Sequence, residues 1–220
     1  LVPSPSAGCD HALQCWCETH RSRKNAIMQN IFCRLSCKQA DKIIAVSEAT
    51  KKDIVSLLSI DANRITAILN GGGYGEYVTP SDAECEKIKK RFEIGAEPFF
   101  AYTGNIEPRK NIVTILKAFE IACDRLDGTV SLVLAGKLSW RTQPIIEAIK
   151  QNKYKDRIHL PGYISEDEKK YLMYNACAFV FPSNYEGFGI PIIEAMSCGG
   201  IVITADNSSL KEVGGTTAFY

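Results

Sequence analysis

The sequence predicts an α/β fold in which helices cover both faces of a parallel sheet, preceded by part of another domain. Three observations predict it. From residue 98 onward, short β-rich runs alternate with helical stretches, several of these runs are apolar at consecutive positions, and glycines follow them. Alternation of this kind forms βαβ units with parallel strands, and strands buried on both faces are apolar throughout.

The first part of the chain has fewer strands. The sequence predicts a basic helix at about 21–40, a strand at 42–47, a helix over 48–58 that Ser47 caps, and a strand at 65–69. The glycine run at 71–73 predicts a hinge. We therefore predict that residues 1–70 are the remnant of one domain and that residues 71–220 are a second one. The first sheet cannot close with so few strands, so we expect exposed apolar surface there.

The second part supplies the sheet. After a charged helix at 81–94, the predicted strands are 99–104, 130–136, 157–162, 177–183 and 200–205, and the predicted helices are 111–126, 144–152, 166–176 and 190–198. The strands end in Gly104, Gly136, Gly162 and Ser183, which predicts that ligand-binding loops lie at the carboxyl edge of the sheet. The last residues predict the start of another strand, so we expect an internal piece of a longer protein.

Composition excludes several classes of protein. The chain has 220 residues, 45% of them hydrophobic and 23% charged, and a net charge of +1. These values predict a soluble globular protein and do not favour nucleic acid as a partner. No apolar run reaches the roughly 20 residues of a membrane-spanning helix, and the first residues lack the regions of a signal peptide. We expect a cytoplasmic location.

The nine cysteines predict neither disulfides nor a metal site. Four of them are scattered through apolar helices and strands, which indicates reduced core side chains. The others cluster with two histidines: Cys9, His11, Cys15, Cys17, His20, Cys33 and Cys37. Their spacings match no common zinc motif, and Cys33 and Cys37 are four residues apart on a predicted helix, where both would face a core. We expect no metal.

An anion site is predicted after the strand at 99–104. Arg109 and Lys110 lie in the turn that precedes a helix near Asn111. Unpaired N–H groups and the helix dipole already favour an anion at a helix start, and two cations strengthen that preference. A solvated charged turn is the alternative interpretation.

The stretch NYEGFGIPIIEAMSCGG supplies a second half of the site. Gly187 and Gly189 let the backbone pass close to a ligand, and Pro191 suits the start of a helix. Glu186 and Glu194 flank this turn, and their carboxylates would accept hydrogen bonds from hydroxyl groups. A ligand that has hydroxyl groups at both ends and phosphates between them would satisfy both halves of the site, and a nucleotide sugar is such a ligand. Otherwise Glu194 only complements a helix dipole and Glu186 is a loop charge.

Taken in order, these segments resemble the retaining GT-B glycosyltransferases of family 4, which include mannosyltransferases and glucosyltransferases. The motifs that carry the resemblance are ADKIIAVSEATKKDI, NGGGYGEY, YTGNIEPRKNI, LVLAGK, LPGYISEDE, FVFPSNYEGFGIPIIEAMSCGGIVI and NSSLKEV. The resemblance implies a Rossmann-like domain that binds the donor, a first domain that binds a glycan or lipid-linked acceptor, and no metal or other cofactor. It also implies peripheral association of the full-length protein with the inner face of the membrane.

The resemblance also implies roles for individual residues. Arg109 and Lys110 would clamp the donor diphosphate, Glu194 would bind the ribose, and Glu186 would face the sugar hydroxyls. The implied donor site consists of Gly104, Arg109, Lys110, Glu186, Gly187, Phe188, Gly189, Ile190 and Glu194. Residues near Lys137 and from Tyr163 to Ser165 would meet the base.

Two positions depart from the family pattern. Cys9 stands where the family places a histidine beside the sugar, and Asn105 stands where many relatives have an arginine. We expect a glycosyltransferase that uses a donor of the GDP-mannose or UDP-hexose type, with the fragment alone inactive. Two alternatives stay open: a non-catalytic fragment that binds nucleotide sugars, and a sugar-nucleotide epimerase, which fits the EGFGIPIIEA segment less well.

Overall fold

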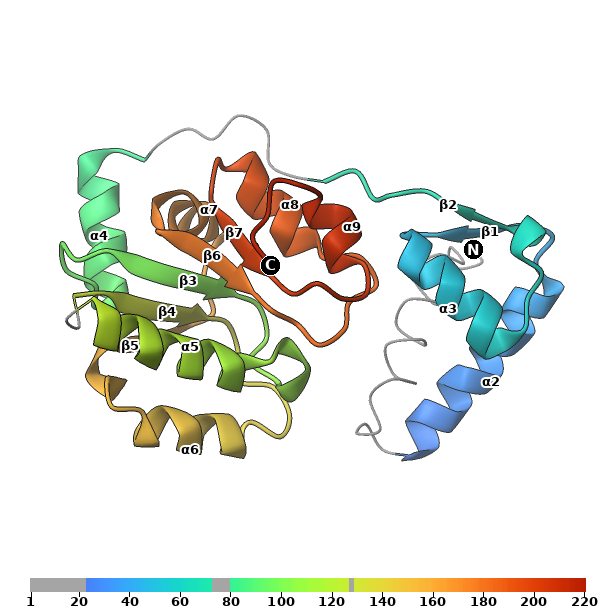
Figure 1. Ribbon diagram of the computed structural model, residues 1–220, viewed down its shortest axis with the longest axis horizontal. Helices are drawn as coiled ribbons and strands as arrows, with labels where there is room; N and C mark the ends of the chain where they lie inside the picture. Colours follow the sequence, from blue (N-terminus) through green and yellow to red (C-terminus); the bar gives the residue numbers. More distant parts are fainter. Residues whose placement is uncertain (1–22, 73–79, 127–128) are drawn as a thin grey trace. The chain divides into compact units, whose positions relative to one another are not determined.

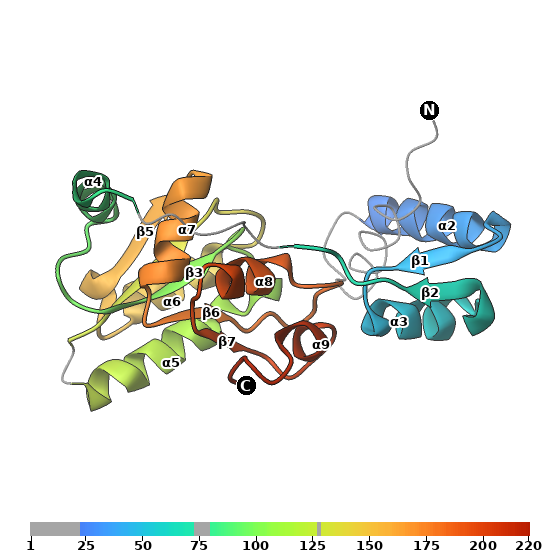
Figure 2. The same cartoon turned by 90° about the horizontal axis from the view of Figure 1, so that it is seen from above.

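The computed structural model describes residues 23–72, 80–126 and 129–220, which Figures 1 and 2 show from two directions. The chain divides into two compact units. The first contains Leu1–Gly71, Tyr185–Gly189 and Asp206–Val213, and the second contains Gly72–Asn184, Ile190–Ala205 and Gly214–Tyr220. The boundary near residue 70 that the sequence suggests stays a prediction.

The first unit contains the helices and strands that the sequence predicts for it. They are α2 (Arg23–Gln39), β1 (Ile43–Ala45), α3 (Glu48–Leu58), a 3₁₀ turn (Ala62–Arg64) and β2 (Ile65–Ala67), with α9 (Leu210–Gly214) joining them from the far end of the sequence. β1 and β2 pair in parallel. The Oγ of Ser47 accepts a hydrogen bond from the N–H of Thr50 at 2.9 Å, which caps α3 as expected.

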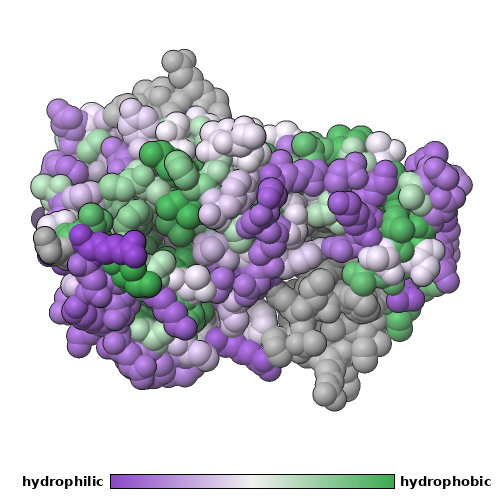
Figure 3. Space-filling view, in the orientation of Figure 1, coloured by the Kyte–Doolittle hydropathy of each residue, from purple (hydrophilic) through white to green (hydrophobic). Residues whose placement is uncertain are grey.

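α2 is apolar on two opposite sides. Cys33 and Cys37 are buried against Ile54 and Leu58 of α3, which confirms that these two cysteines belong to a core. The other side of α2 exposes Met28, Ile31, Phe32 and Leu35, each at least half accessible. This unit therefore exposes apolar side chains on helix α2, whereas the expectation concerned its sheet, and Figure 3 shows apolar side chains reaching the surface on one face of the molecule.

The second unit is built on one parallel sheet. Its strands are β3 (Phe99–Thr103), β4 (Ser131–Ala135), β5 (Ile158–Gly162), β6 (Ala178–Phe181) and β7 (Val202–Thr204), in the order β5-β4-β3-β6-β7. Its helices are α4 (Asp82–Phe92), α5 (Ile112–Arg125), α6 (Gln143–Gln151), α7 (Glu166–Asn175) and α8 (Ile190–Ser197), with 3₁₀ turns at Pro108–Lys110 and Lys155–Arg157. The predicted α/β class is confirmed.

The prediction for the end of the chain is only partly right. Instead of a further strand, the structure has α9, followed by an isolated parallel bridge between Phe219 and Ile203. The bridge consists of two backbone hydrogen bonds, from Phe219 N to Val202 O and from Thr204 N to Phe219 O, both 2.9 Å. One bridge fixes a single residue beside β7 and does not make a strand.

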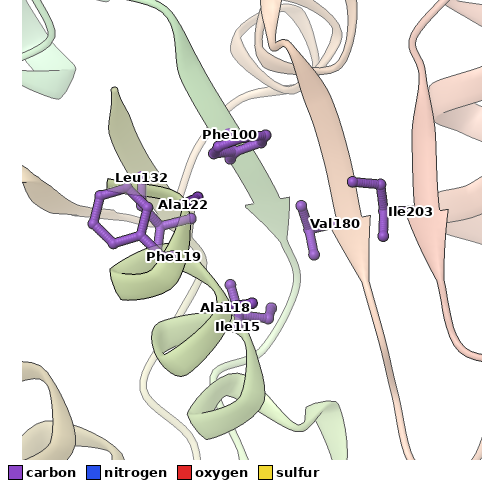
Figure 4. A pocket seen from close by; sticks show the side chains of 8 residues that line it. All are labelled: Phe100, Ile115, Ala118, Phe119, Ala122, Leu132, Val180 and Ile203. Carbon is purple, nitrogen blue, oxygen red and sulfur yellow. The ribbon is translucent and has the colours of Figure 1, made fainter. Parts of the chain in front are cut away.

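Helices cover both faces of the sheet. Figure 2 shows α7 and α8 on one face and α5 on the other. Figure 4 shows the α5 side, where side chains of α5 meet side chains of four strands around an apolar pocket of about 180 Å³. The pocket is lined by Phe100, Ile115, Ala118, Phe119, Ala122, Leu132, Val180 and Ile203. This layered arrangement directs the carboxyl ends of all five strands to one edge.

Candidate functional site

Two strand ends are packed unusually close at the carboxyl edge of the sheet. Gly104 and Gly136 follow β3 and β4 with φ of +136° and +148°, values that a side chain rarely allows. A Cβ on Gly136 would lie 1.8 Å from the carbonyl oxygen of Gly104. Only glycine fits at position 136, and the edge therefore presents bare backbone.

A pocket of about 350 Å³ opens at this edge, and all of its walls belong to the second unit. The ends of β3, β4 and β5 form one side, and α7 and α8 form the other. The lining residues are Thr103, Gly104, Asn105, Ala135, Gly136, Lys137, Tyr163, Ile164, Glu166, Lys169, Pro191 and Glu194. Ligands of open α/β sheets bind at this edge, beyond the carboxyl ends of the strands.

A lysine joins two carboxylates in the helical wall of the pocket. Lys169 Nζ of α7 lies 3.0 Å from Glu194 Oε1 of α8 and 3.0 Å from Glu166 Oε2. Burial acts to lower the pKa of Lys169, but hydrogen bonds and charge from Glu166 and Glu194 outweigh it, so the pKa is raised. Lys169 therefore stays a cation at neutral pH.

The opposite wall carries an aromatic ring and a second cation. Lys137 Nζ lies 5.1 Å from the centre of the Tyr163 ring, and Tyr163 is 70% exposed. The loop that holds Tyr163 is tied at both ends. Arg91 of α4 donates to the Tyr163 carbonyl at 2.7 Å, and Ser165 and Glu168 form a capping box at the start of α7. The ring is thus presented from an anchored backbone.

Arg109 and Lys110 lie in the turn before α5, as predicted, but they do not line this pocket. Arg109 Nη2 forms an ion pair with Glu107 Oε1 at 2.8 Å, and both side chains are largely buried. Lys110 Nζ stands 4.8 Å from the centre of the Phe181 ring. Two cations therefore lie beside the start of α5, where the helix dipole is positive. Arg109 contacts Glu107, and Lys110 contacts the ring of Phe181.

The Gly-Phe-Gly turn belongs to the first unit, where its carbonyl groups are fixed. Ser209 Oγ donates to the carbonyls of Glu186 and Phe188 at 2.9 and 2.8 Å. The Gly187 carbonyl accepts from Ser47 Oγ at 2.7 Å. Glu186 and Phe188 are buried, at 6% and 5% exposure. The sequence predicted ligand contact for this turn and did not predict that Ser47 and Ser209 would donate hydrogen bonds to its carbonyl groups.

The residues that end this turn lead directly into α8. Gly189 has φ of +106°, which favours glycine, and Ile190 is the first residue of α8 and is 47% exposed. Pro191 follows and lines the pocket, as Glu194 does one helical turn later. The motif therefore contributes to the pocket through its helical half.

The structure brings some of the predicted residues together and leaves others apart. Gly104 and Glu194 line the pocket with Lys137 and Tyr163, which the sequence had placed near a base. The other predicted donor-site residues are not among its lining residues: Arg109, Lys110, Glu186, Gly187, Phe188, Gly189 and Ile190. Their roles stay predictions.

Sequence reasoning missed Glu166 and Lys169. A signal was present, because Ser165 and Glu168 form a capping pattern that starts a helix directly after a strand end. The pattern did not show that Lys169, a little further along α7, would meet Glu194 of another helix. That pairing depends on how α7 packs beside α8.

In the parts of the chain that the structure describes, no group of three or more His, Cys, Asp or Glu residues is arranged to hold a metal ion. Cys9, His11, Cys15, Cys17 and His20 lie outside these parts. None of the described helices is both long and apolar enough to cross a membrane.

Comparison with known proteins gives consistent results. The family model described as glycosyl transferases group 1 matches residues 84–216. The O-antigen chain mannosyltransferase B of Escherichia coli is 32% identical over 180 residues, which are 82% of this chain and 47% of that protein. This chain therefore spans less than half of that relative.

Solved structures support the same fold. A glycosyltransferase from Rickettsia africae ESF-5 superposes with a TM-score of 0.71 at 21% identity, over 81% of this chain and 48% of that one. The Anabaena protein Alr3699/HepE, in complex with UDP-glucose, superposes with a TM-score of 0.70 at 20% identity, over 84% of this chain and 50% of that one. The expected GT-B architecture is confirmed at the level of fold.

Proposed function

Because this chain belongs to the glycosyl transferases of group 1, we propose that the full-length protein transfers a hexose from a nucleotide-sugar donor to a glycan or lipid-linked acceptor. We further propose that the donor is of the GDP-mannose or UDP-hexose type. The mannosyltransferase relative supports the first choice, and the UDP-glucose complex of the Anabaena protein supports the second.

The observation that carries the proposal is the pocket at the carboxyl edge of the sheet. It combines bare glycine backbone, an exposed aromatic ring and a carboxylate on a helix. A nucleoside has matching parts, since its base can stack on a ring and its ribose hydroxyls can donate to a carboxylate. We assign the ribose to Glu194 and the base to the side of the pocket formed by Tyr163 and Lys137.

We assign the diphosphate to Arg109 and Lys110. Their cations lie next to the start of α5, where the helix dipole adds to their charge. During transfer the leaving nucleotide gains negative charge, and preformed cations stabilise it without a metal ion. Binding requires Arg109 to exchange or share its contact with Glu107.

The remaining roles concern the sugar. We propose that Glu186 accepts hydrogen bonds from hydroxyl groups of the donor hexose, next to the backbone from Gly187 to Ile190. We also propose transfer with retention of the anomeric configuration, supported by the resemblance of the EGFGIPIIEA segment to retaining enzymes. NMR of the anomeric proton in the first product tests that assignment.

Titration calorimetry of this chain tests the phosphate assignment. We expect Arg109→Ala and Lys110→Ala each to weaken binding of GDP or UDP by about 1.5–3 kcal/mol, the usual value of a hydrogen bond to a charged group. Binding of guanosine or uridine should change far less, because a nucleoside has no phosphate.

Lys117→Ala is the matched control, because Lys117 is an exposed lysine on α5. It should leave both affinities unchanged. Equal losses for nucleoside and diphosphate in the Arg109 and Lys110 variants would contradict the assignment.

The non-catalytic alternative is not favoured, because the Escherichia coli relative is named for transfer of a sugar. The same proposal places the full-length protein in the cytoplasm, at the inner face of the membrane when the acceptor is lipid-linked. Cell fractionation tests this placement.

A further inference from the structure

We infer that Lys169 is a positioning residue that holds the Glu194 carboxylate in the orientation that a ribose diol meets. This inference rests on the proposed function, because it concerns the ribose contact of the donor. Lys169 lies on α7 and Glu194 on α8, so the contact joins two helices that form one wall of the pocket.

The two carboxylates bound to Lys169 differ in their surroundings. Its Nζ lies 3.0 Å from an oxygen of each, but the Glu166 side chain is 67% exposed and the Glu194 side chain only 16%. Water screens an exposed ion pair, and such a pair contributes little. The partly buried pair with Glu194 is therefore the contact that can fix a side chain.

A glutamate side chain has three rotatable bonds and loses that freedom when a ligand binds it. A group that is held in place before binding avoids part of this entropic cost. Lys169 Nζ donates a hydrogen bond to Oε1 of Glu194 at 3.0 Å and so holds one oxygen of this carboxylate. A ribose with both hydroxyl groups would meet a carboxylate whose orientation is already set.

Charge gives Lys169 a second effect. The lining residues that are charged at neutral pH are Lys137, Glu166, Lys169 and Glu194, whose formal charges cancel. Loss of Lys169 leaves excess negative charge in the pocket, and this charge weakens the binding of any diphosphate by repulsion. A comparison of ribose with deoxyribose removes this effect, because both ligands carry the same phosphates.

The neighbouring lysine provides a matched control. Lys170 Nζ lies 3.7 Å from Asp167 Oδ1, whose side chain is 88% exposed, and Lys170 does not line the pocket. Lys170→Met removes the same charge from the same helix and keeps the contact between Lys169 and Glu194.

The experiment measures dissociation constants of GDP, 2′-deoxy-GDP, UDP and 2′-deoxy-UDP by calorimetry. We expect the unmodified chain to prefer the ribose form of its nucleotide by about 10- to 100-fold, the range that one hydrogen bond to a charged group contributes. Lys169→Met should bring this ratio close to one. Lys169→Arg, which keeps the cation, and Lys170→Met should retain the ratio.

A double variant tests the coupling directly. Glu194→Gln should lose the ribose preference, and adding Lys169→Met to it should cause no further loss, because both changes act through one contact. Thermal unfolding without nucleotide shows that each variant is folded. If Lys169→Met does not fold, Lys169→Gln replaces it with the same expected loss, since its side chain is one atom shorter than that of lysine.

The outcomes separate the inference from the proposed function. An unchanged ribose preference in Lys169→Met, or an equal loss in Lys170→Met, overturns the inference and leaves the donor site standing. Nucleotide binding without ribose preference in the unmodified chain overturns both the ribose role of Glu194 and the inference. Absence of binding by GDP and UDP overturns the proposed donor pocket and the inference with it.

Discussion

At the scale of single residues, the two glutamates of the EGFGIPIIEA segment lie in different surroundings. Glu194 is on the wall of a pocket and contacts a lysine, whereas Glu186 is buried in a turn held by Ser209. Residues that contact different parts of one ligand should affect different measurements. This difference makes their proposed roles separable.

We predict that Glu194→Gln weakens binding of GDP or UDP, because the ribose contact is lost, by about 1.5–3 kcal/mol. Glu186→Gln should leave nucleotide affinity nearly unchanged and lower the rate of transfer in the full-length enzyme. Calorimetry gives the first quantity and a donor-consumption assay the second. The reverse order of effects would show that the two roles are exchanged.

We expect His159 to make the stability of the folded chain depend on pH. Its Nε2 is buried without a hydrogen-bond partner in the described structure. Burial lowers the pKa of His159, and the charges of Glu93 and Glu97 oppose this only in part. The unfolded chain therefore takes up a proton at a pH where the folded chain does not. Stability is full above about pH 6.5, the value for free histidine, and falls as pH drops toward the folded pKa.

We predict that His159→Gln reduces this dependence. Between about pH 7.5 and 5.5, the free energy of unfolding should fall more in the unmodified chain than in the variant. Urea denaturation at both pH values measures it. Carboxylates add a dependence of their own, but mainly nearer their ordinary pKa values, below this range. Equal losses in the two proteins would mean that His159 is not the group responsible.

At the scale of elements, α7 begins directly after the loop that carries Tyr163, and its first turns line the pocket. Ser165 Oγ accepts from Glu168 N at 3.2 Å, and Glu168 Oε2 accepts from Ser165 N at 2.8 Å. Both bonds of a capping box are present, and they fix the direction in which α7 leaves the loop that carries Tyr163. The capping box therefore contributes both to the stability of the fold and to the position of the Tyr163 loop in the pocket.

We predict that Ser165→Ala destabilises the protein by about 1 kcal/mol, the usual cost of a lost N-cap. Nucleotide binding should weaken as well, because the Tyr163 loop loses one of its anchors. Ser81→Ala, in the capping box of α4, is the control: it should lower stability similarly without a direct effect on binding. Chemical denaturation and calorimetry measure the two effects.

At the scale of the whole molecule, one side of α2 exposes a group of apolar side chains, which the amino-acid composition alone does not indicate. Met28, Ile31, Phe32 and Leu35 recur at helical spacing opposite the side that packs on α3. Soluble monomers seldom expose a contiguous apolar patch without a covering partner. We therefore expect this chain to associate in solution.

We predict that Phe32→Glu reduces this association, because it places a charge in the centre of the apolar side. Sedimentation velocity over a range of concentrations measures it. Ser56→Glu, an exposed position on α3, adds the same charge elsewhere and should have no effect. Association that is unchanged in Phe32→Glu would exclude this side of α2 as the contact.

Much of the fold could be predicted because each element has a local cause. Strands that are apolar throughout, the helix cap at Ser47 and the glycines at strand ends placed almost every described helix and strand to within a few residues. The last ten residues were the exception. A β-rich segment becomes a strand only when a partner accepts several hydrogen bonds, and here Phe219 makes one bridge.

The sequence by itself determined the layered α/β class and the presence of Gly104 and Glu194 at the carboxyl edge, because strand periodicity and glycine conformation are local properties. Only the tertiary structure decided which side chains meet. Lys169 contacts Glu194, which lies 25 positions further along the chain, and Arg91 contacts Tyr163, which lies 72 positions further along. Such pairs depend on how helices pack on the sheet, and no short stretch of sequence encodes that packing.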